Sequence, residues 1–382
     1  MSKILIPSHT YIDNNQYINL SNLINLWKSK KILIITDENI RKAGLLKPLE
    51  TLFSQLECSY TIIDDSPAEP SADDVDQINY QVNSVECDSI IGIGGGSILD
   101  ITKLIGTMYH SKYKVRELIE DSSLITKKVK TIGIPTTCGT GSEATINSIV
   151  SLPEKGTKLG IVNTSFLMDA VILNPETLIN LPKSLVASTG IDALTHTVEC
   201  YTGNKANILS DFYALEGAKL IFENLEKAYL DGSNILAKQN LLLGSFFGGI
   251  AINSSGTTAV HALSYPLGGS FHIPHGVSNA IMFVPIMKFN RDSIEDRLTS
   301  LFDYVFKNIN LSTENEKSQF VIDKIEDLVK VTNIPSKLDQ YGVTIDDLEF
   351  LVDAGSKQKR LLDNNRKPLT LDDIESIYRS LL

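Results

Sequence analysis

The chain has few cysteines and too little positive charge to balance its acidic residues. Its 382 residues include four cysteines, and 35 Lys and Arg stand against 46 Asp and Glu, for a net charge of −11. The cysteines are scattered and form no CxxC pair, which argues against a disulfide framework and favours reduced, intracellular thiols. Nucleic acids and anionic membranes require a basic face, so the charge balance argues against both as partners.

Long apolar runs and a leader segment are also missing. The opening residues, MSKILIPSHTYIDNN, contain no apolar stretch of signal-peptide length and no small-residue cleavage site. No apolar run approaches the roughly 20 residues of a membrane span. The apolar fraction of 42% is nevertheless enough to bury a core, which excludes global disorder. These features predict a soluble, cytoplasmic, globular protein of one large domain or two.

Short β-branched runs recur through the first half of the chain. Their apolar residues are continuous rather than alternating, which is typical of strands buried on both faces of a parallel sheet. The five expected strands are Lys31–Asp37, Ser59–Asp64, Ser89–Gly94, Val129–Pro135 and Ala170–Pro175. Helices at Asp37–Leu56 and Ser71–Glu86 would supply crossovers between parallel strands.

The strand signal ends near residue 185. Beyond it, apolar residues recur three or four apart along Ile208–Leu225, and Leu241–Ile252 is apolar on all sides. Further helices are expected at 276–290, 293–308, 314–331 and 371–382. The sequence therefore predicts two domains. Residues 1–184 form an α/β dinucleotide-binding domain with a parallel, Rossmann-like sheet, and residues 185–382 form an all-helical domain.

A glycine-rich turn follows one of the expected strands. Gly94, Gly95, Gly96 and Ser97 stand between that strand and an expected helix. Glycines let the backbone approach a pyrophosphate closely, and the amides at a helix N-terminus bind the anion. The GxGxxG fingerprint is incomplete, because Ser97 occupies the place of its last glycine. A plain tight turn is the alternative interpretation.

A second turn, PTTCGTGSE at residues 135–143, also follows a strand. Its threonines, Thr136, Thr137 and Thr140, offer hydroxyls that suit contacts with ribose, phosphate or nicotinamide at a sheet crevice. The alternative is a loop that caps the next helix. Asp37, at the end of an earlier strand, can accept hydrogen bonds from a ribose and repel a 2′-phosphate, which favours NAD over NADP. Its alternative role is as a helix N-cap.

Four of the six histidines lie between residues 196 and 275. Asp192 and His196 are four residues apart on an expected helix and so face the same way. With His261 and His275 they would offer one carboxylate and three imidazoles, a donor set that suits Fe²⁺ or Zn²⁺. For Asp192 and His196 alone, a buried helix pair is the alternative, so the metal site is a hypothesis at this point.

These motifs together resemble the iron-containing (group III) alcohol dehydrogenase family. The similarity is carried by GGGSILD at 94–100, IPTTCGTGSEAT at 134–145, STGIDALTHTVECY at 188–201 and HALSYPLGGSFHIPHGVSNAI at 261–281. NNRKPLTLDDI at 364–374 is similar to the family's closing helix. The resemblance covers nearly the whole chain in the same order. It implies a dehydroquinate-synthase-like architecture of an α/β and a helical domain, usually in a homodimer or larger homo-oligomer.

The resemblance also implies roles for individual residues. The metal ligands would be Asp192, His196, His261 and His275. The cofactor-binding residues would be Asp37, Gly94, Gly95, Gly96, Ser97, Asp100, Thr136, Thr137, Thr140 and Lys158, of which Lys158 matches a lysine near the nicotinamide ribose. Many members of the family carry a second histidine where this chain has Tyr265. Tyrosine is a poor base at neutral pH unless its pKa is shifted, so Tyr265 and the nearby His272 are both candidates for the proton relay.

The implied reaction is hydride transfer between NAD(H) and a primary alcohol or aldehyde held at one Fe²⁺ or Zn²⁺. The substrate would be a small alcohol or diol, or the alcohol of a polyhydroxylated sugar acid. Three alternatives stay open: a hydroxyacid–oxoacid transhydrogenase with a bound nucleotide, a metal-dependent lyase of the dehydroquinate-synthase type, and a non-enzymatic scaffold.

Overall fold

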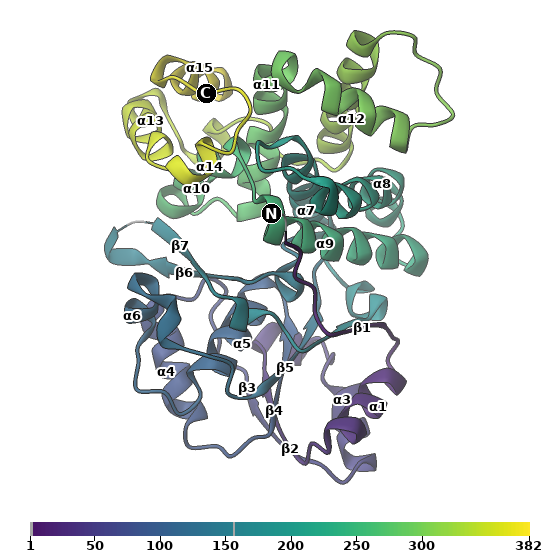
Figure 1. Ribbon diagram of the computed structural model, residues 1–382, viewed down its shortest axis with the longest axis vertical. Helices are drawn as coiled ribbons and strands as arrows, with labels where there is room; N and C mark the ends of the chain where they lie inside the picture. Colours follow the sequence, from purple (N-terminus) through teal and green to yellow (C-terminus); the bar gives the residue numbers. More distant parts are fainter. Residues whose placement is uncertain (1–2, 156) are drawn as a thin grey trace. The chain divides into compact units, whose positions relative to one another are not determined.

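The computed structural model describes residues 3–155 and 157–382, which form two compact units (Figure 1). The α/β unit consists of Leu5–Thr137 and Gly141–Leu181. The helical unit consists of Pro182–Leu382, Cys138–Thr140 and, at the N-terminus, Lys3 and Ile4. The expected domain boundary after residue 184 falls inside the first turn of α7 (Lys183–Thr202).

A six-stranded parallel sheet with the order β1-β8-β5-β4-β2-β3 forms the centre of the α/β unit. Its strands are β1 (His9–Ile12), β2 (Lys31–Ile35), β3 (Ser59–Ile63), β4 (Ser89–Gly94), β5 (Lys130–Pro135) and β8 (Ala170–Leu173). The five expected strands and their parallel arrangement are thus confirmed. Sequence reasoning missed β1, whose residues alternate between half-buried and exposed rather than forming a continuous apolar run.

Alternate residues of the strands pack on opposite faces of this sheet. In β2, Leu33 and Ile35 belong to one apolar cluster, with residues of α4 (Ala72–Val82) and α5 (Gly96–Met108). Ile32 and Ile34 belong to a second cluster, with residues of α1 (Ile18–Trp27) and α3 (Lys47–Gln55). The continuous apolarity of the strands therefore reflects burial on both faces, as expected.

Two expectations for the α/β unit need correction. The helix expected over Asp37–Leu56 is divided into α2 (Glu38–Lys42) and α3, because Gly44 between them has a φ of +75°. An antiparallel hairpin of β6 (Asn147–Leu152) and β7 (Thr157–Val162) was not expected at all. The remaining elements of this unit are α6 (Val115–Glu120) and the 3₁₀ turns Ser122–Leu124, Ser142–Ala144, Pro153–Lys155, Thr164–Phe166 and Pro175–Leu178.

Among its described residues, the second unit consists of helices and the loops between them and contains no strand, as expected. After α7 it contains α8 (Ile208–Leu230), α9 (Ile235–Ser255), α10 (Ala259–Phe271), α11 (His275–Val305), α12 (Glu314–Val331), α13 (Leu348–Ser356), α14 (Lys359–Leu362) and α15 (Leu371–Leu381), with 3₁₀ turns at Asp339–Tyr341 and Ile345–Asp347. The break expected between residues 290 and 293 is wrong, since α11 is continuous there. Asn290 is buried within it, and its amide donates to Asn365 at 2.9 Å.

Helix α9 is long and apolar enough to cross a membrane by length and composition, which the sequence analysis did not expect of any segment. In the structure, 61% of its most apolar window is buried. Helices α7 and α8 both pack against it. The apolar surface of α9 therefore serves the packing of the helical unit.

Candidate active site

The predicted nucleotide-binding segments follow three neighbouring strands of the sheet. Strand β4 lies between β2 and β5 and pairs in parallel register with both. The carboxyl end of β2 leads into Asp37, that of β4 into Gly95–Ser97, and that of β5 into Thr136–Thr137. Because β3 is added on one side of β2 and β4 on the other, the chain changes direction there. Doubly wound sheets bind ligands outside the carboxyl ends of strands at such a switch point.

The glycine-rich turn begins a helix. Gly95 is the N-cap of α5, so the first amides of this helix have no partner within it. A side chain at Gly94 would place its Cβ 2.6 Å from Ile98, which explains why the turn needs glycine there. A Cβ on Gly95 would lie 3.5 Å from the Thr137 side chain, so the two turns are neighbours. The Ser97 hydroxyl donates to the Ala68 carbonyl at 2.5 Å.

Asp37 forms the helix cap that was its alternative role. Its Oδ1 accepts hydrogen bonds from the amides of Asn39 at 2.8 Å and Ile40 at 3.0 Å. Both bonds use the same oxygen, so the cap leaves Oδ2 for another partner. Asp37 also lines a pocket of about 280 Å³ with Glu38, Asn39, Asp64, Asp65, Ser66 and Ala68. Capping and ribose recognition are therefore compatible.

Asp100, another predicted cofactor residue, is buried among protein partners. It is 7% exposed, and its Oδ1 accepts from the Ser142 hydroxyl at 2.5 Å and lies 2.8 Å from Nζ of Lys103. Its Oδ2 accepts from the Ile149 amide at 2.9 Å. Both oxygens thus have protein partners that connect Asp100 to the second turn and to the Ile149 amide, and its contact with a nucleotide stays a prediction.

Two further cofactor candidates have positions that the sequence did not suggest. Lys158 lies on β7, and its Nζ is 2.7 Å from Glu69 Oε1. Thr140 belongs to the short segment that groups with the helical unit, whereas Thr136 and Thr137 belong to the α/β unit. The contacts of all three threonines and of Lys158 with a nucleotide stay predictions.

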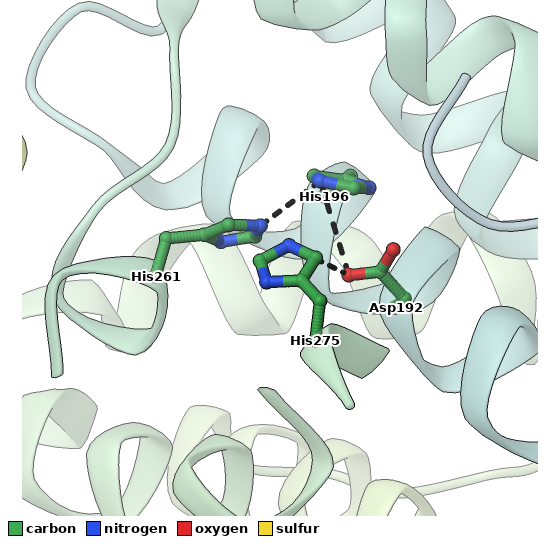
Figure 2. A group of neighbouring side chains, drawn as sticks. All are labelled: Asp192, His196, His261 and His275. Carbon is green, nitrogen blue, oxygen red and sulfur yellow. Dashed lines mark hydrogen bonds and ion pairs between the residues drawn. The ribbon is translucent and has the colours of Figure 1, made fainter. Parts of the chain in front are cut away.

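Asp192, His196, His261 and His275 come together in the helical unit (Figure 2). Helix α7 carries the first two, α10 carries His261, and His275 is the first residue of α11. One ligand atom from each lies within 4.8 Å of all the others. Oδ1 of Asp192 is 4.0 Å from Nε2 of His196 and 3.6 Å from Nε2 of His275.

The orientation of two imidazoles fits a metal site. Nδ1 of His196 faces the Gly139 carbonyl at 3.2 Å, and Nδ1 of His261 faces Glu199 Oε2 at 2.5 Å. Both oxygens only accept, so each Nδ1 holds the proton and each Nε2 presents a lone pair. The two Nε2 atoms are 2.9 Å apart. Lone pairs this close repel unless a cation lies near both, so the donor set fits a divalent metal.

Electrostatics maintains the protonation states that metal binding needs. Burial opposes ionisation of Asp192, but the facing imidazoles of His196, His275 and His261 outweigh it and hold the pKa of Asp192 below its ordinary value. Burial lowers the pKa of His196, which keeps the imidazole neutral. A carboxylate with neutral imidazoles is the form in which these side chains bind a metal.

Sequence reasoning missed Glu199. Fully buried on α7, it accepts hydrogen bonds from the Thr258 hydroxyl at 2.6 Å and the Val260 amide at 2.7 Å, besides its contact with His261. Burial opposes its ionisation, but His261 and the hydrogen bonds outweigh this and lower its pKa. Glu199 follows Asp192 by seven residues and so lies on the same helix face. This seven-residue spacing could have indicated from the sequence that Glu199 lies near the predicted ligands.

Asn279 was missed as well. It lies one turn after His275, and its Nδ2 donates to Asp192 Oδ1 at 2.6 Å. The same nitrogen is 3.1 Å from His261 Nε2 and 3.2 Å from His275 Nε2. Its buried Oδ1 has no hydrogen-bond partner among the described residues. The amide thus satisfies the atoms that would otherwise ligate a cation.

Of the two proton-relay candidates, Tyr265 lies beside the four clustered side chains. Its ring centroid is 6.4 Å from that of His261 and 6.1 Å from that of His275. Burial raises the pKa of its phenol, which makes it a poorer base still. His272 is exposed and ends α10 with a φ of +55°. Among the described residues, no ring contact joins His272 to this group.

Glu143 of the second turn predicts a pH-dependent stability. It is 2% exposed, its Oε1 has no partner among the described residues, and burial raises its pKa from 4.5 to about 7. The folded protein therefore favours the protonated form of Glu143 more than the unfolded chain does. The stability that depends on this protonated carboxyl is fully present below pH 4.5 and is lost as the pH rises through about 7. Glu143→Gln should therefore raise the free energy of unfolding at pH 8 by up to roughly 3 kcal/mol, with no gain at pH 4.5.

Urea unfolding at the two pH values tests this expectation. Glu223→Gln, an exposed position on α8, is the matched control and should change neither value. A Glu143→Gln variant that is equally stabilised at both pH values, or is not stabilised at pH 8, would contradict the assignment.

Comparison with known proteins covers both halves of the chain. Residues 7–175 match the model of iron-containing alcohol dehydrogenase, and residues 186–382 match that of the C-terminal part of the Fe-containing alcohol dehydrogenase family. Long-chain-alcohol dehydrogenase 1 of Geobacillus thermodenitrificans is 33% identical, covering 100% of this chain and 96% of its own. Sulfoacetaldehyde reductase of Bilophila wadsworthia is 29% identical over 94% of each chain. A crystal structure of 1,3-propanediol oxidoreductase superposes with a TM-score of 0.92 at 26% identity, covering 100% of both chains.

Proposed function

Because the chain belongs to the iron-containing alcohol dehydrogenase family, we propose that this alcohol oxidoreductase transfers hydride between NAD(H) and a primary alcohol or aldehyde with the help of one divalent metal, iron or zinc. The main support for this proposal is that Nε2 of His196 and Nε2 of His261 lie 2.9 Å apart, while Nδ1 of each ring faces an oxygen that accepts its proton in a hydrogen bond. A cytoplasmic homodimer is part of the same proposal.

The metal would be held by Asp192, His196, His261 and His275. When bound, it polarises the oxygen of the substrate, and the nicotinamide accepts or donates the hydride. Glu199 and the Gly139 carbonyl keep the protons on Nδ1 of His261 and His196, so that Nε2 of each stays unprotonated. Tyr265 keeps its phenolic proton at neutral pH and can donate it in a hydrogen bond, but it does not act as the base.

The nucleotide would lie against the carboxyl ends of β2, β4 and β5. The first amides of α5 would bind the pyrophosphate, with Gly94, Gly95, Gly96 and Ser97 forming the turn. Oδ2 of Asp37 would accept from the ribose. Thr136, Thr137, Thr140 and Lys158 are proposed to complete the cofactor site. Asp100 would hold the second turn at residues 135–143 in place through its contacts with Ser142 and Lys103.

The proposal is tested by NADH oxidation at neutral pH, with the apoprotein loaded separately with Fe²⁺ and Zn²⁺. The substrates are aldehydes from propanal to sugar-acid aldehydes. Metal-dependent turnover that concentrates on a few aldehydes is expected. If NADH binds but no aldehyde is reduced, hydride transfer to aldehydes is wrong, and nucleotide that survives purification would then favour the transhydrogenase.

Asp37 should decide between the two nicotinamide cofactors. Asp37→Asn keeps a good N-cap acceptor but removes the charge that would repel a 2′-phosphate. The ratio of kcat/KM with NADPH to that with NADH should rise by about tenfold or more, since like-charge contacts cost on the order of several kcal/mol. Asp37→Gly, which removes both cap and charge, should shift the ratio similarly. If both variants leave the ratio unchanged and only Asp37→Gly loses stability, Asp37 is a helix cap alone.

A further inference from the structure

One arginine of the helical unit has no hydrogen-bond or ion-pair partner among the described residues. Six of the seven arginines form hydrogen bonds or ion pairs: Arg41, Arg116, Arg291, Arg297, Arg366 and Arg379. Arg360 is exposed and forms neither, nor a cation–π contact, within residues 3–155 and 157–382. In a chain with a net charge of −11, acidic partners are abundant. A guanidinium that takes none of them is available to a ligand.

The packing of three helices brings α14, which carries Arg360, against α10, which carries Tyr265. Helices α13 and α14 both pack against α10 (Figure 1). The packing is close, because a Cβ on Gly355 of α13 would lie 2.8 Å from Leu263 of α10. Arg360 lies on α14, and among charged groups it exerts the largest effect on the pKa of Tyr265, which it lowers against the effect of burial. Since α14 packs against α10, the guanidinium lies within electrostatic reach of the Tyr265 phenol.

Tyr265 relates Arg360 to the predicted metal ligands, because the Arg360 charge acts on its phenol and its ring lies next to two of the histidines. Tyr265 contacts the rings of both His261 and His275. A substrate whose oxygen lies at these histidines and whose chain passes Tyr265 would present its far end to Arg360. A guanidinium forms paired hydrogen bonds with a carboxylate or a sulfonate, which ammonium groups match less well.

We propose that Arg360 binds a terminal anionic group of the substrate, so that the preferred substrates are short aldehydes or alcohols with a carboxylate or sulfonate at the end opposite the reacting carbon. This inference rests on the proposed function and specifies its substrate class.

The test compares charged and neutral substrates of the same length. The kcat/KM of the metal-loaded enzyme with NADH is measured for succinic semialdehyde against butanal, and for sulfoacetaldehyde against acetaldehyde. The wild type should prefer the anion in at least one pair by about tenfold or more. The pair with the larger preference distinguishes a carboxylate from a sulfonate ligand.

Three variants attribute the preference to one residue. Arg360→Met should reduce the ratio of charged to neutral kcat/KM by about tenfold or more, mainly through a higher KM for the charged aldehyde, and Arg360→Lys should restore part of it. Lys359→Met is the matched control, because it removes the same charge from the neighbouring exposed position of the same helix. It should leave the ratio unchanged.

Absence of an anion preference in the wild type, or an unchanged ratio in Arg360→Met, would overturn the inference while the proposed function stands. If no aldehyde is reduced, calorimetric titration with 4-hydroxybutyrate and 1-butanol, without nucleotide, separates the two proposals. Selective binding of the anion that Arg360→Met abolishes would support the anion site even though the proposed reaction fails. No such selectivity would overturn both.

Discussion

His261→Ala is expected to abolish retention of the metal and, with it, turnover. His261 joins the other ligands to Glu199, because its Nε2 lies 2.9 Å from that of His196 and its Nδ1 faces the buried carboxylate. The alanine variant removes a donor and also leaves Glu199 as a buried charge without its imidazole partner. The loss should exceed the roughly 10- to 100-fold weakening that follows removal of an outer hydrogen-bond partner. Metal content per chain after dialysis is the direct measurement.

Two further variants make the result specific. Glu199→Gln keeps a hydrogen-bond acceptor near His261 but removes the charge, so metal affinity should fall by roughly 10- to 100-fold rather than vanish. His110→Asn removes an exposed histidine of the α/β unit and should leave metal content unchanged. Far-ultraviolet circular dichroism shows whether each variant is folded. Unchanged metal content in folded His261→Ala would refute the assignment of this ligand.

The second large effect is expected for Lys103→Met, which should destabilise the α/β unit by about 3–5 kcal/mol. Lys103 is fully buried, and its ammonium lies 2.8 Å from Asp100. It also donates to the Ser142 carbonyl at 3.0 Å and the Thr145 hydroxyl at 3.1 Å. Methionine fills a similar volume but leaves the Asp100 carboxylate buried without a counter-charge. Urea unfolding measures the change.

A double variant separates the loss of the ion pair from the loss of packing. Asp100→Asn in the Lys103→Met background removes the stranded charge and should recover part of the lost stability. Lys128→Met, an exposed lysine of the same unit, is the control and should change the free energy of unfolding by less than about 0.5 kcal/mol. A loss below about 1 kcal/mol for Lys103→Met would mean that this buried ion pair does not hold the turn.

The sequence predicted those elements whose burial requires a recognisable pattern of apolar residues. Strand β4 is buried at every position, so its continuous apolarity was readable. Strand β1 was missed because it is short, alternates in burial and pairs with β8, which is distant in the sequence. Strand β6 of the hairpin also alternates in burial, so it lacks a continuous apolar run. The division between α2 and α3 depended on the positive φ of Gly44, which an isolated glycine in a helical pattern does not reveal.

The candidate site shows the same division. Asp192, His196, His261 and His275 were predicted because imidazoles and carboxylates are rare in apolar helices and because a family pattern pointed to them. Gly139 orients His196 through its backbone carbonyl. Every residue has such a carbonyl, so the residue type at position 139 could not reveal this role. Arg360 follows the last predicted ligand by 85 residues of chain, and only the packing of α14 on α10 brings the two regions together.

The three residues Cys138–Thr140 limit how this protein can be recombined with its relatives. They lie within the part of the chain that forms the sheet, yet they belong to the helical unit. The fit is tight, since a Cβ on Gly139 would lie 2.8 Å from Thr189 Cβ and 3.0 Å from its Cα. A chimera joined at residue 182 would therefore combine one parent's loop with the other parent's α7. Crossovers that transfer residues 138–140 together with α7 should yield active hybrids more often, and gene fusion or shuffling at the apparent boundary should be selected against.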